Sequence, residues 1–342
     1  MVVQLTKGLG GSNKPESVDV KLIAYGYEGG FAALRPVIDK IAITFDIPSY
    51  EDQQGIKTFL IGAKEDKALL PASPANGKSN YGWRLLLPIP GSGEHLLLEA
   101  GPPTPKNEAT KSAPFLRFEF NPAKLGAEGV LYLREWLRDN VLLDQYLWSD
   151  IATSGRVTRL DVAVDLLGVR TENLLVSSHV KADGGKPFKR LAYHSLAGQL
   201  ETLYPHFRKG ARAPFCIYDK KQELADTGFE AKYGSLSHVR VEARKQPNRP
   251  ITTLHKMKNP FLGLTVIDPM GKVDPPETAH AWVFFLDSCR ARGVEWALSQ
   301  LPAEDMRVAY KHAFQEAERN VWRAGKLWDF WPAALLQSGL LP

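Results

Sequence analysis

Alternating hydrophobic and polar residues indicate a series of short strands in the first half of the chain. Residues 38–45 (IDKIAITF) carry apolar side chains between polar ones and predict a first core strand. Residues 83–87 and 95–98 flank a turn rich in proline and glycine, which predicts a hairpin with a longer loop. Apolar and polar side chains alternate again in residues 115–120, and this pattern ends before Pro122. These segments predict neighbouring strands of one sheet.

Helical spacing of apolar residues appears in three other regions. Residues 129–148 place leucine, valine and tryptophan at helical intervals and predict a core-facing helix with a break near Asn140. Residues 171–178 predict a short helix. From residue 277 onward the composition shifts to that of helices.

A second group of strands is predicted in the middle of the chain. Residues 156–167 change to a period of two, and a strand is expected near 190–194. Residues 200–206 and 214–220 predict a second hairpin, and residues 237–245 alternate once more. The fold class we expect is α+β, with a central antiparallel sheet, flanking helices and a helical C-terminal region.

The domain organisation expected from these patterns has four parts. They are a flexible leader at 1–35, a main strand-rich domain at 36–248, a proline-punctuated connector at 249–276 and helices at 277–342.

Composition narrows the class of protein. With 342 residues, of which 44% are hydrophobic, the chain can bury a large core. No apolar run approaches the roughly 20 residues that span a bilayer, and the first residues lack the apolar centre of a signal peptide, so we expect a cytoplasmic protein without a membrane partner. Two cysteines cannot build a disulfide framework or a cysteine-rich zinc site, so a metal would need oxygen or histidine ligands.

The positive charge is local. The formal net charge is +5, and residues 201–260 alone contain twelve Lys or Arg against six Asp or Glu. Such an excess favours a polyanionic partner, and it includes the basic turn that carries Arg208, Lys209 and Arg212.

The first candidate site segment is residues 159–165 (RLDVAVD). A period of two puts Arg159, Asp161 and Asp165 on one face, with apolar residues on the other. Two carboxylates at this spacing can approach a hard cation such as Mg²⁺ or Mn²⁺ if a third comes from a neighbouring strand. A solvent-facing strand side is the alternative interpretation.

The second segment is residues 214–223 (PFCIYDKKQE). Here Tyr218 and Lys220 are expected on one strand face, beside Lys221. A phenol with a pKa near 10 is a weak nucleophile at neutral pH, so it would need a cation or a metal-polarised phosphate nearby. A tyrosine that only packs at a strand edge is the alternative.

The third segment is residues 239–245 (VRVEARK). It places Arg240, Glu242 and Arg244 on one face, where Glu242 could complete a metal set and the arginines could bind phosphate. A surface ladder of ion pairs would show the same pattern.

Taken together, the three motifs resemble those of one known family. Arg-x-Asp-x-Ala-x-Asp, then Ile-Tyr-Asp-Lys-Lys-x-Glu, then Arg-x-Glu-x-Arg, in this order, are similar to rolling-circle initiators of the Rep_trans type. That family includes plasmid initiators, filamentous-phage replication initiation factors and relaxases of conjugative elements. The hairpin before the second motif and the early strand are also similar, so the resemblance covers residues 38–245.

The resemblance implies a Rep-like domain that nicks one DNA strand at an origin hairpin that is single-stranded at the nick. It implies a 5′-phosphotyrosyl link at Tyr218 assisted by Lys220, a free 3′-OH for a host polymerase, and later rejoining. The acidic positions of the family fall on Asp161, Asp165 and Glu242, with Mg²⁺ or Mn²⁺ as the metal. Strand separation would need a host helicase, and a homodimer is an open option. The residues expected to contact DNA are Arg159, Arg208, Lys209, Arg212, Lys221, Arg240 and Arg244.

The chain also departs from the family. The glycine that the family often has after the tyrosine equivalent to Tyr204 is missing, and no His-hydrophobic-His triplet is present. Tyr204 is therefore the reserve nucleophile. Two other functions stay open: a DNA-binding initiator or repressor without catalysis, and a metal-dependent nuclease that uses activated water.

Overall fold

The protein divides into two compact units that alternate along the chain. The computed structural model describes residues 2–5, 16–27, 30–73, 80–102, 114–142, 145–178, 189–207, 213–268 and 274–342. Unit 1 consists of Met1–Pro36, Ala163–Ala243 and Asn259–Phe330, and unit 2 of Val37–Val162, Arg244–Lys258 and Trp331–Pro342.

The elements of unit 1 come from all three of its segments. They are β1 (Val2–Leu5), β2 (Glu16–Asp19), η1 (Val20–Leu22), β3 (Ile23–Tyr27), β4 (Phe31–Leu34), η2 (Thr171–Asn173), β11 (Leu175–Ser178), β12 (Lys189–His194), β13 (Leu200–Phe207), β14 (Phe215–Asp219), α4 (Lys220–Asp226), most of β15 (His238–Lys245), η5 (Pro260–Gly263), β16 (Leu264–Ile267), α5 (Ala279–Arg292), α6 (Val294–Ser299), α7 (Glu304–Val321) and α8 (Ala324–Trp328).

Unit 2 is built mainly from the segment that follows Pro36. Its elements are β5 (Val37–Phe45), α1 (Tyr50–Glu65), β6 (Leu70–Pro71), β7 (Trp83–Pro88), β8 (His95–Ala100), β9 (Leu116–Phe120), α2 (Pro122–Asn140), α3 (Trp148–Ser154), η4 (Ile251–Lys256) and α9 (Trp331–Gln337). Strand β10 (Arg156–Leu167) begins in unit 2 and ends in unit 1.

An antiparallel sheet carries the candidate site in unit 1. Its strand order is β12-β13-β14-β15-β10, and the end of β10 also pairs with β4. The pairing of β13 with β14 confirms the second predicted hairpin, with Thr202 opposite Tyr218. Residues Phe215 to Ile217 of β14 are all buried, so both faces of this strand are covered.

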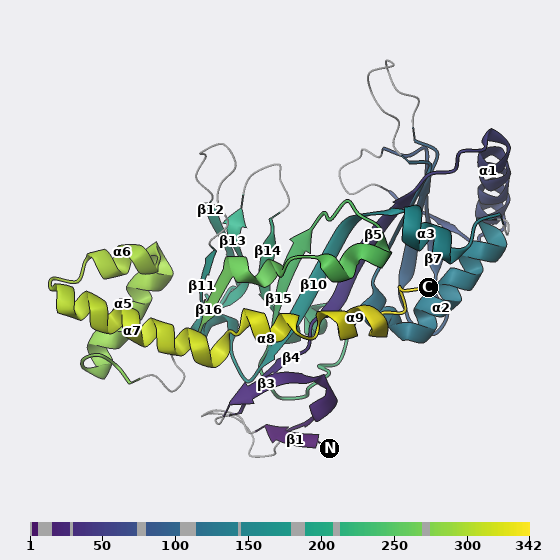
Figure 1. Cartoon of the computed structure of the whole chain (residues 1–342). Helices are drawn as coiled ribbons and strands as arrows, with labels where there is room; N and C mark the ends of the chain where they lie inside the picture. Colours follow the sequence, from purple (N-terminus) through teal and green to yellow (C-terminus); the bar gives the residue numbers. More distant parts are fainter. Residues whose placement is uncertain are drawn as a thin grey trace, which may run out of the picture. The chain divides into compact units, whose positions relative to one another are not determined.

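A helical bundle forms the other core of unit 1. Aromatic side chains of α5 and α7 pack together, with Trp282 stacked on Phe285 and 5.6 Å from Phe314 between ring centroids. Leu175 of β11 and Ile267 of β16 belong to the same cluster. Figure 1 shows α5, α6 and α7 grouped together in yellow-green.

Unit 2 contains an antiparallel sheet with helices packed on it. Its strand order is β10-β5-β9-β8-β7-β6, which confirms the predicted first strand and first hairpin. Helix α2 packs against β5, and Asn121 caps its N-terminus by accepting from the Lys124 amide at 3.0 Å. The break predicted near Asn140 is confirmed, because α2 ends there.

The expected fold class is confirmed. The described residues form an α+β protein with antiparallel sheets, flanking helices and a helical C-terminal region. Among these residues, no helix combines the length and the apolar character that crossing a membrane requires.

Three local predictions differ from the structure. The described part of the leader contains strands, and Phe31–Leu34 are buried because β4 pairs with β10. Residues 171–178 form a 3₁₀ turn and strand β11, where a short helix was expected. Pairing of β11 with β16, ninety residues away, outweighs the weak helical pattern of this short segment. The connector likewise contains η4, η5 and β16.

Strand β10 ends at a glycine that no other residue can replace without strain. Gly168 has φ of +82°, its amide donates to the Ser237 carbonyl at 2.9 Å, and an added Cβ would lie 2.1 Å from the Gly30 carbonyl oxygen. Gly198 has a similar φ of +79° but open space around its Cα.

We therefore expect Gly168→Ala to destabilise the protein more than Gly198→Ala. Both substitutions carry the left-handed backbone penalty, of about 1 kcal/mol or more, and only the first adds a clash of about 1 to 3 kcal/mol. Thermal unfolding followed by circular dichroism measures the difference. Equal midpoints for the two variants would contradict the tight approach of β10 to Gly30.

Candidate active site

Strands β14 and β15 bring Tyr218 and Glu242 together in unit 1. The two strands are antiparallel, with Tyr218 opposite Arg240 and Cys216 opposite Glu242. Side chains of diagonal neighbours on one face can meet, and the Tyr218 hydroxyl donates a hydrogen bond to Oε1 of Glu242 at 2.8 Å. Glu242 is only 5% exposed. A buried carboxylate is thus placed to accept the proton of the predicted nucleophile.

Lys220 reaches the same tyrosine from a helix. The strand ends at Asp219, whose side chain caps α4 by accepting from the Gln222 amide at 2.9 Å. The prediction that Lys220 shares a strand face with Tyr218 is therefore wrong, because Asp219 starts a helix there. Even so, Lys220 is 6% exposed, and its Nζ lies 5.8 Å from the centroid of the Tyr218 ring and pairs with Glu223.

Asp165 forms a largely buried ion pair with Arg240. The guanidinium donates from Nε to Oδ1 at 2.7 Å and from an Nη to Oδ2 at 2.9 Å, which is a bidentate arrangement. Nε2 of His238 lies 3.2 Å from the same Oδ1. Both oxygens of the carboxylate therefore face nitrogen groups of β15.

This environment sets the protonation of Asp165. Burial opposes its ionisation, but the charge of Arg240 and hydrogen bonds from His238 and Arg240 outweigh burial and hold the pKa of Asp165 well below its ordinary value. Next to this cluster, the Tyr233 ring packs edge-on against His238 at 5.3 Å. Burial, and then the negative charge of Asp165, raise the pKa of Tyr233 to about 12.

Asp161 and Arg159 lie in unit 2, in a different network of charges. Arg159 donates to Oδ2 of Asp161 at 2.8 Å and to Glu119 at 2.6 Å, and Asp161 is 2% exposed. Glu119 also pairs with Arg117 and Lys40. Burial raises the pKa of Glu119, but the charges of Arg159 and Arg117 outweigh it, so the pKa is lowered.

The three predicted metal ligands thus have partners of their own in the protein. Asp161 is bound by Arg159, Asp165 by Arg240, and Glu242 by Tyr218. Over the described ranges, no group of three or more His, Cys, Asp or Glu side chains could hold a metal ion. These residues do not fit a shared Mg²⁺ or Mn²⁺ site as they lie, and metal dependence stays a prediction.

The remaining candidates are distributed over several elements. Nζ of Lys221 donates to the Ser235 carbonyl at 3.2 Å, and Arg244 lies half-buried near the end of β15 in unit 2. Tyr204 follows Thr202, the partner of Tyr218, by two residues, so it projects from the same face of the sheet, where its ring contacts Tyr193. Arg208, Lys209 and Arg212 lie outside the described residues.

Two residues near Asp165, His238 and Tyr233, were not identified from the sequence. His238 lies two positions before Arg240, and extending the alternation of the third motif by one step would have found it. Tyr233 comes from the loop before β15 and has no signal in the sequence pattern.

No family model and no curated protein matches the chain. The geometry above is therefore the basis for any functional proposal.

The Asp165 ion pair predicts a distinct dependence of stability on pH. A pKa depressed by folding stabilises the protein above the ordinary carboxyl pKa of about 4, and this stabilisation is lost as the pH falls below it. We expect Asp165→Asn, which leaves the Arg240 charge buried without its partner, to lower stability at pH 7 by about 3 to 5 kcal/mol. The difference in the free energy of unfolding between this variant and the wild type should be smaller at pH 3 than at pH 7.

Thermal unfolding of both proteins at pH 7 and pH 3 measures this gap. Asp66→Asn serves as the control, because Asp66 is exposed at the end of α1 and should leave the midpoint close to wild type at both pH values. A gap between Asp165→Asn and wild type that stays constant from pH 7 to pH 3 would show that the ion pair does not stabilise the fold.

Proposed function

We propose that this protein nicks and rejoins one strand of DNA, with Tyr218 as the nucleophile, as an initiator of rolling-circle replication. The observation that carries the proposal is the 2.8 Å hydrogen bond from the Tyr218 hydroxyl to the buried carboxylate of Glu242. A phenol must lose its proton to a base as it attacks phosphorus, and Glu242 is in position to accept that proton.

In the proposed reaction, Oη of Tyr218 attacks the scissile phosphorus while its proton passes to Glu242. The bond from phosphorus to the 3′-oxygen breaks, and the 3′-oxygen leaves as a hydroxyl after taking a proton from solvent. The 5′-phosphate stays bonded to Tyr218. Attack by the free 3′-OH on this phosphotyrosine reverses the step and rejoins the strand.

The timing of the proton transfer follows from the two acidities. A phenolate is a much stronger base than a carboxylate, so complete transfer before attack would be unfavourable. Transfer during the attack avoids much of this cost, because negative charge moves from the phenol oxygen onto the phosphoryl group. Glu242 therefore acts as a base in the transition state.

Two cations next to Tyr218 suit the charge that develops on the phosphate. Lys220 lies over the tyrosine ring, and Arg240 lies opposite Tyr218 in the strand register. Their positive charges would stabilise the pentavalent phosphorus and help to hold the scissile phosphate in line. Asp165 keeps Arg240 in a fixed orientation through its bidentate contact.

The proposal extends to the setting of the reaction. The substrate is an origin hairpin that is single-stranded at the nick, the 3′-OH is extended by a host polymerase, and a host helicase separates the strands. The protein acts in the cytoplasm, and a homodimer is compatible with the scheme. Omitting Mg²⁺ and Mn²⁺ from the cleavage reaction tests whether the protein requires either metal.

We expect Tyr218→Phe to abolish cleavage and covalent adduct formation while DNA affinity stays nearly unchanged. The substitution removes one oxygen and keeps the ring, so it deletes the nucleophile without disturbing packing. Incubation with a labelled single-stranded origin oligonucleotide, followed by denaturing electrophoresis, detects the adduct directly.

Two further variants separate the roles in this site. Glu242→Gln keeps a hydrogen-bond acceptor but not a base, so it should slow adduct formation by about 100-fold or more. Tyr204→Phe should have much less effect. An adduct that persists in Tyr218→Phe and disappears in Tyr204→Phe would move the nucleophile to Tyr204. Metal-dependent cleavage without any adduct would indicate a nuclease that uses water, and binding without cleavage would indicate a non-catalytic initiator or repressor.

A further inference from the structure

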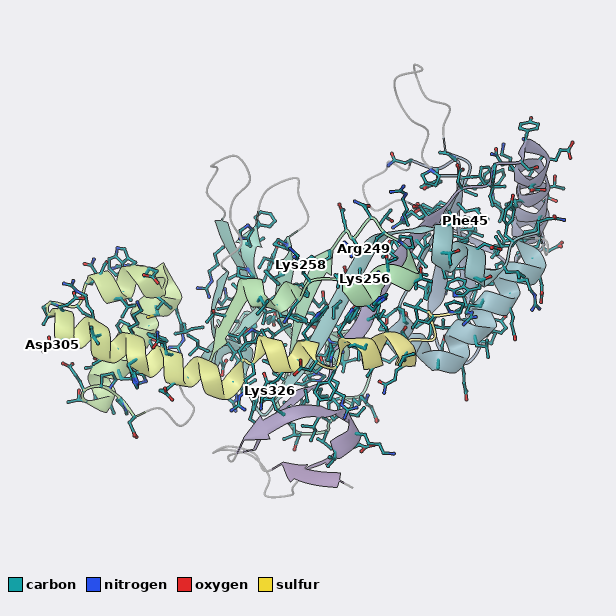
Figure 2. The ribbon with its side chains drawn as sticks, in the orientation of Figure 1. Phe45, Arg249, Lys256, Lys258, Asp305 and Lys326 are labelled. Atoms are coloured by element: carbon teal, nitrogen blue, oxygen red, sulfur yellow. The ribbon has the colours of Figure 1, made fainter. Side chains whose placement is uncertain are left out.

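A basic stretch of unit 2 begins in the last two residues of β15 and continues beyond the third motif. From Arg244 to Lys258 the chain has five Lys or Arg residues and no acidic residue, and the next acidic residue after Glu242 is Asp268. Three of these cations, Arg249, Lys256 and Lys258, lie on η4 and its flanks, as Figure 2 shows. We call these three side chains the basic ridge.

The backbone under the basic ridge is firmly attached to the rest of unit 2. The Arg249 carbonyl accepts from the Val157 amide at 2.9 Å, and the Asn248 amide donates to the Val157 carbonyl at 2.9 Å. The Leu254 carbonyl accepts from the Trp331 indole at 3.0 Å. Ile251, like Leu254, is fully buried, so the apolar side of η4 points inward.

Among the described residues, the cations of the basic ridge have no carboxylate partners. In the part of the chain that the structure describes, no ion pair involves Arg249, Lys256 or Lys258, whereas Arg84, Arg117 and Arg159 all pair with glutamates. Lys256 and Lys258 are exposed and Arg249 is partly exposed. Three unneutralised charges on a rigid backbone are an arrangement suited to a polyanion, because little conformational entropy is lost on binding.

We propose that the basic ridge binds the phosphate backbone of double-stranded DNA. The inference rests on the proposed DNA function. It adds a surface that holds duplex DNA through charge alone, separate from Tyr218 and its neighbours. Such contacts position the DNA and carry no sequence information.

The composition of the segment favours duplex DNA over two other polyanions. Binding of single strands uses exposed aromatic side chains on which bases stack, and residues 244–258 contain no Phe, Tyr or Trp. Binding to an anionic membrane uses apolar side chains that insert into the lipid, whereas Ile251 and Leu254 of this segment are buried in the protein.

The test measures how DNA affinity depends on salt in the full-length protein. We expect the combined variant Arg249→Gln, Lys256→Gln, Lys258→Gln to reduce the slope of log K against log salt for a 30-base-pair duplex by about 2.7. Between about 50 and 200 mM salt, the affinity of the wild type should then fall about 40-fold more than that of the variant.

A charge-matched control distinguishes an effect of the basic ridge from an effect of the total positive charge of the protein. Lys64→Gln, Lys311→Gln and Lys326→Gln together also remove three exposed positive charges and should change the slope much less. Equal slopes for the two triple variants would overturn the inference, as would a loss confined to single-stranded DNA or to vesicles containing anionic lipid.

The two proposals can fail separately. If wild-type protein forms the Tyr218 adduct but the ridge variant keeps the wild-type slope on duplex DNA, the ridge inference fails and the nicking function stands. If the ridge variant shows the expected reduction in the slope of log K against log salt but the wild-type protein forms no adduct, the nicking function fails. The ridge then stands as a duplex-binding surface.

Discussion

Charged side chains on strands that are covered on both faces must neutralise one another inside the protein. Removing an ion from water costs several kcal/mol, which is recovered only through close and complete pairing. Strand β10 carries Arg159, Asp161 and Asp165 among fully buried apolar residues, and each of these charges has a partner within hydrogen-bonding distance. The pairing also fixes the register of β10 and β15, because a slip by one residue would turn Asp165 and Arg240 to opposite faces. The cluster around Tyr218 depends on that register.

The strands of the central sheet could be predicted from the sequence because a period of two is strong in them. Residues 38–45, 115–120 and 237–245 all became strands close to the predicted limits. The prediction failed where pairing over long distances decides the conformation. Strands β3 and β4 lie in a glycine-rich region without a sustained period of two, and β11 exists because β16 is available to pair with it. Neither partner can be identified from local periodicity.

For the candidate site, alternation predicted which side chains share a face but not which ones bind each other. The shared face of Arg240 and Glu242 follows from their spacing of two. The sequence could not show that Asp165 pairs with Arg240 or that Glu242 accepts from Tyr218, since those contacts join different strands. The position of Lys220 was missed for a different reason. Asp219 continues the alternation of the strand but also caps a helix, and the capping role determines the backbone there.

Because the two units alternate along the chain, neither can be separated from the other as one continuous segment. The backbone passes from one unit to the other five times, at residues 36, 162, 243, 258 and 330. Neither unit is therefore a continuous stretch that a gene fragment could encode, and a single proteolytic cut between residues 37 and 330 would leave segments of both units in each fragment. A truncation that removes the last twelve residues would delete α9 from unit 2 and would remove no residue of unit 1. Exchange of whole domains between proteins would likewise find no simple boundary in this chain.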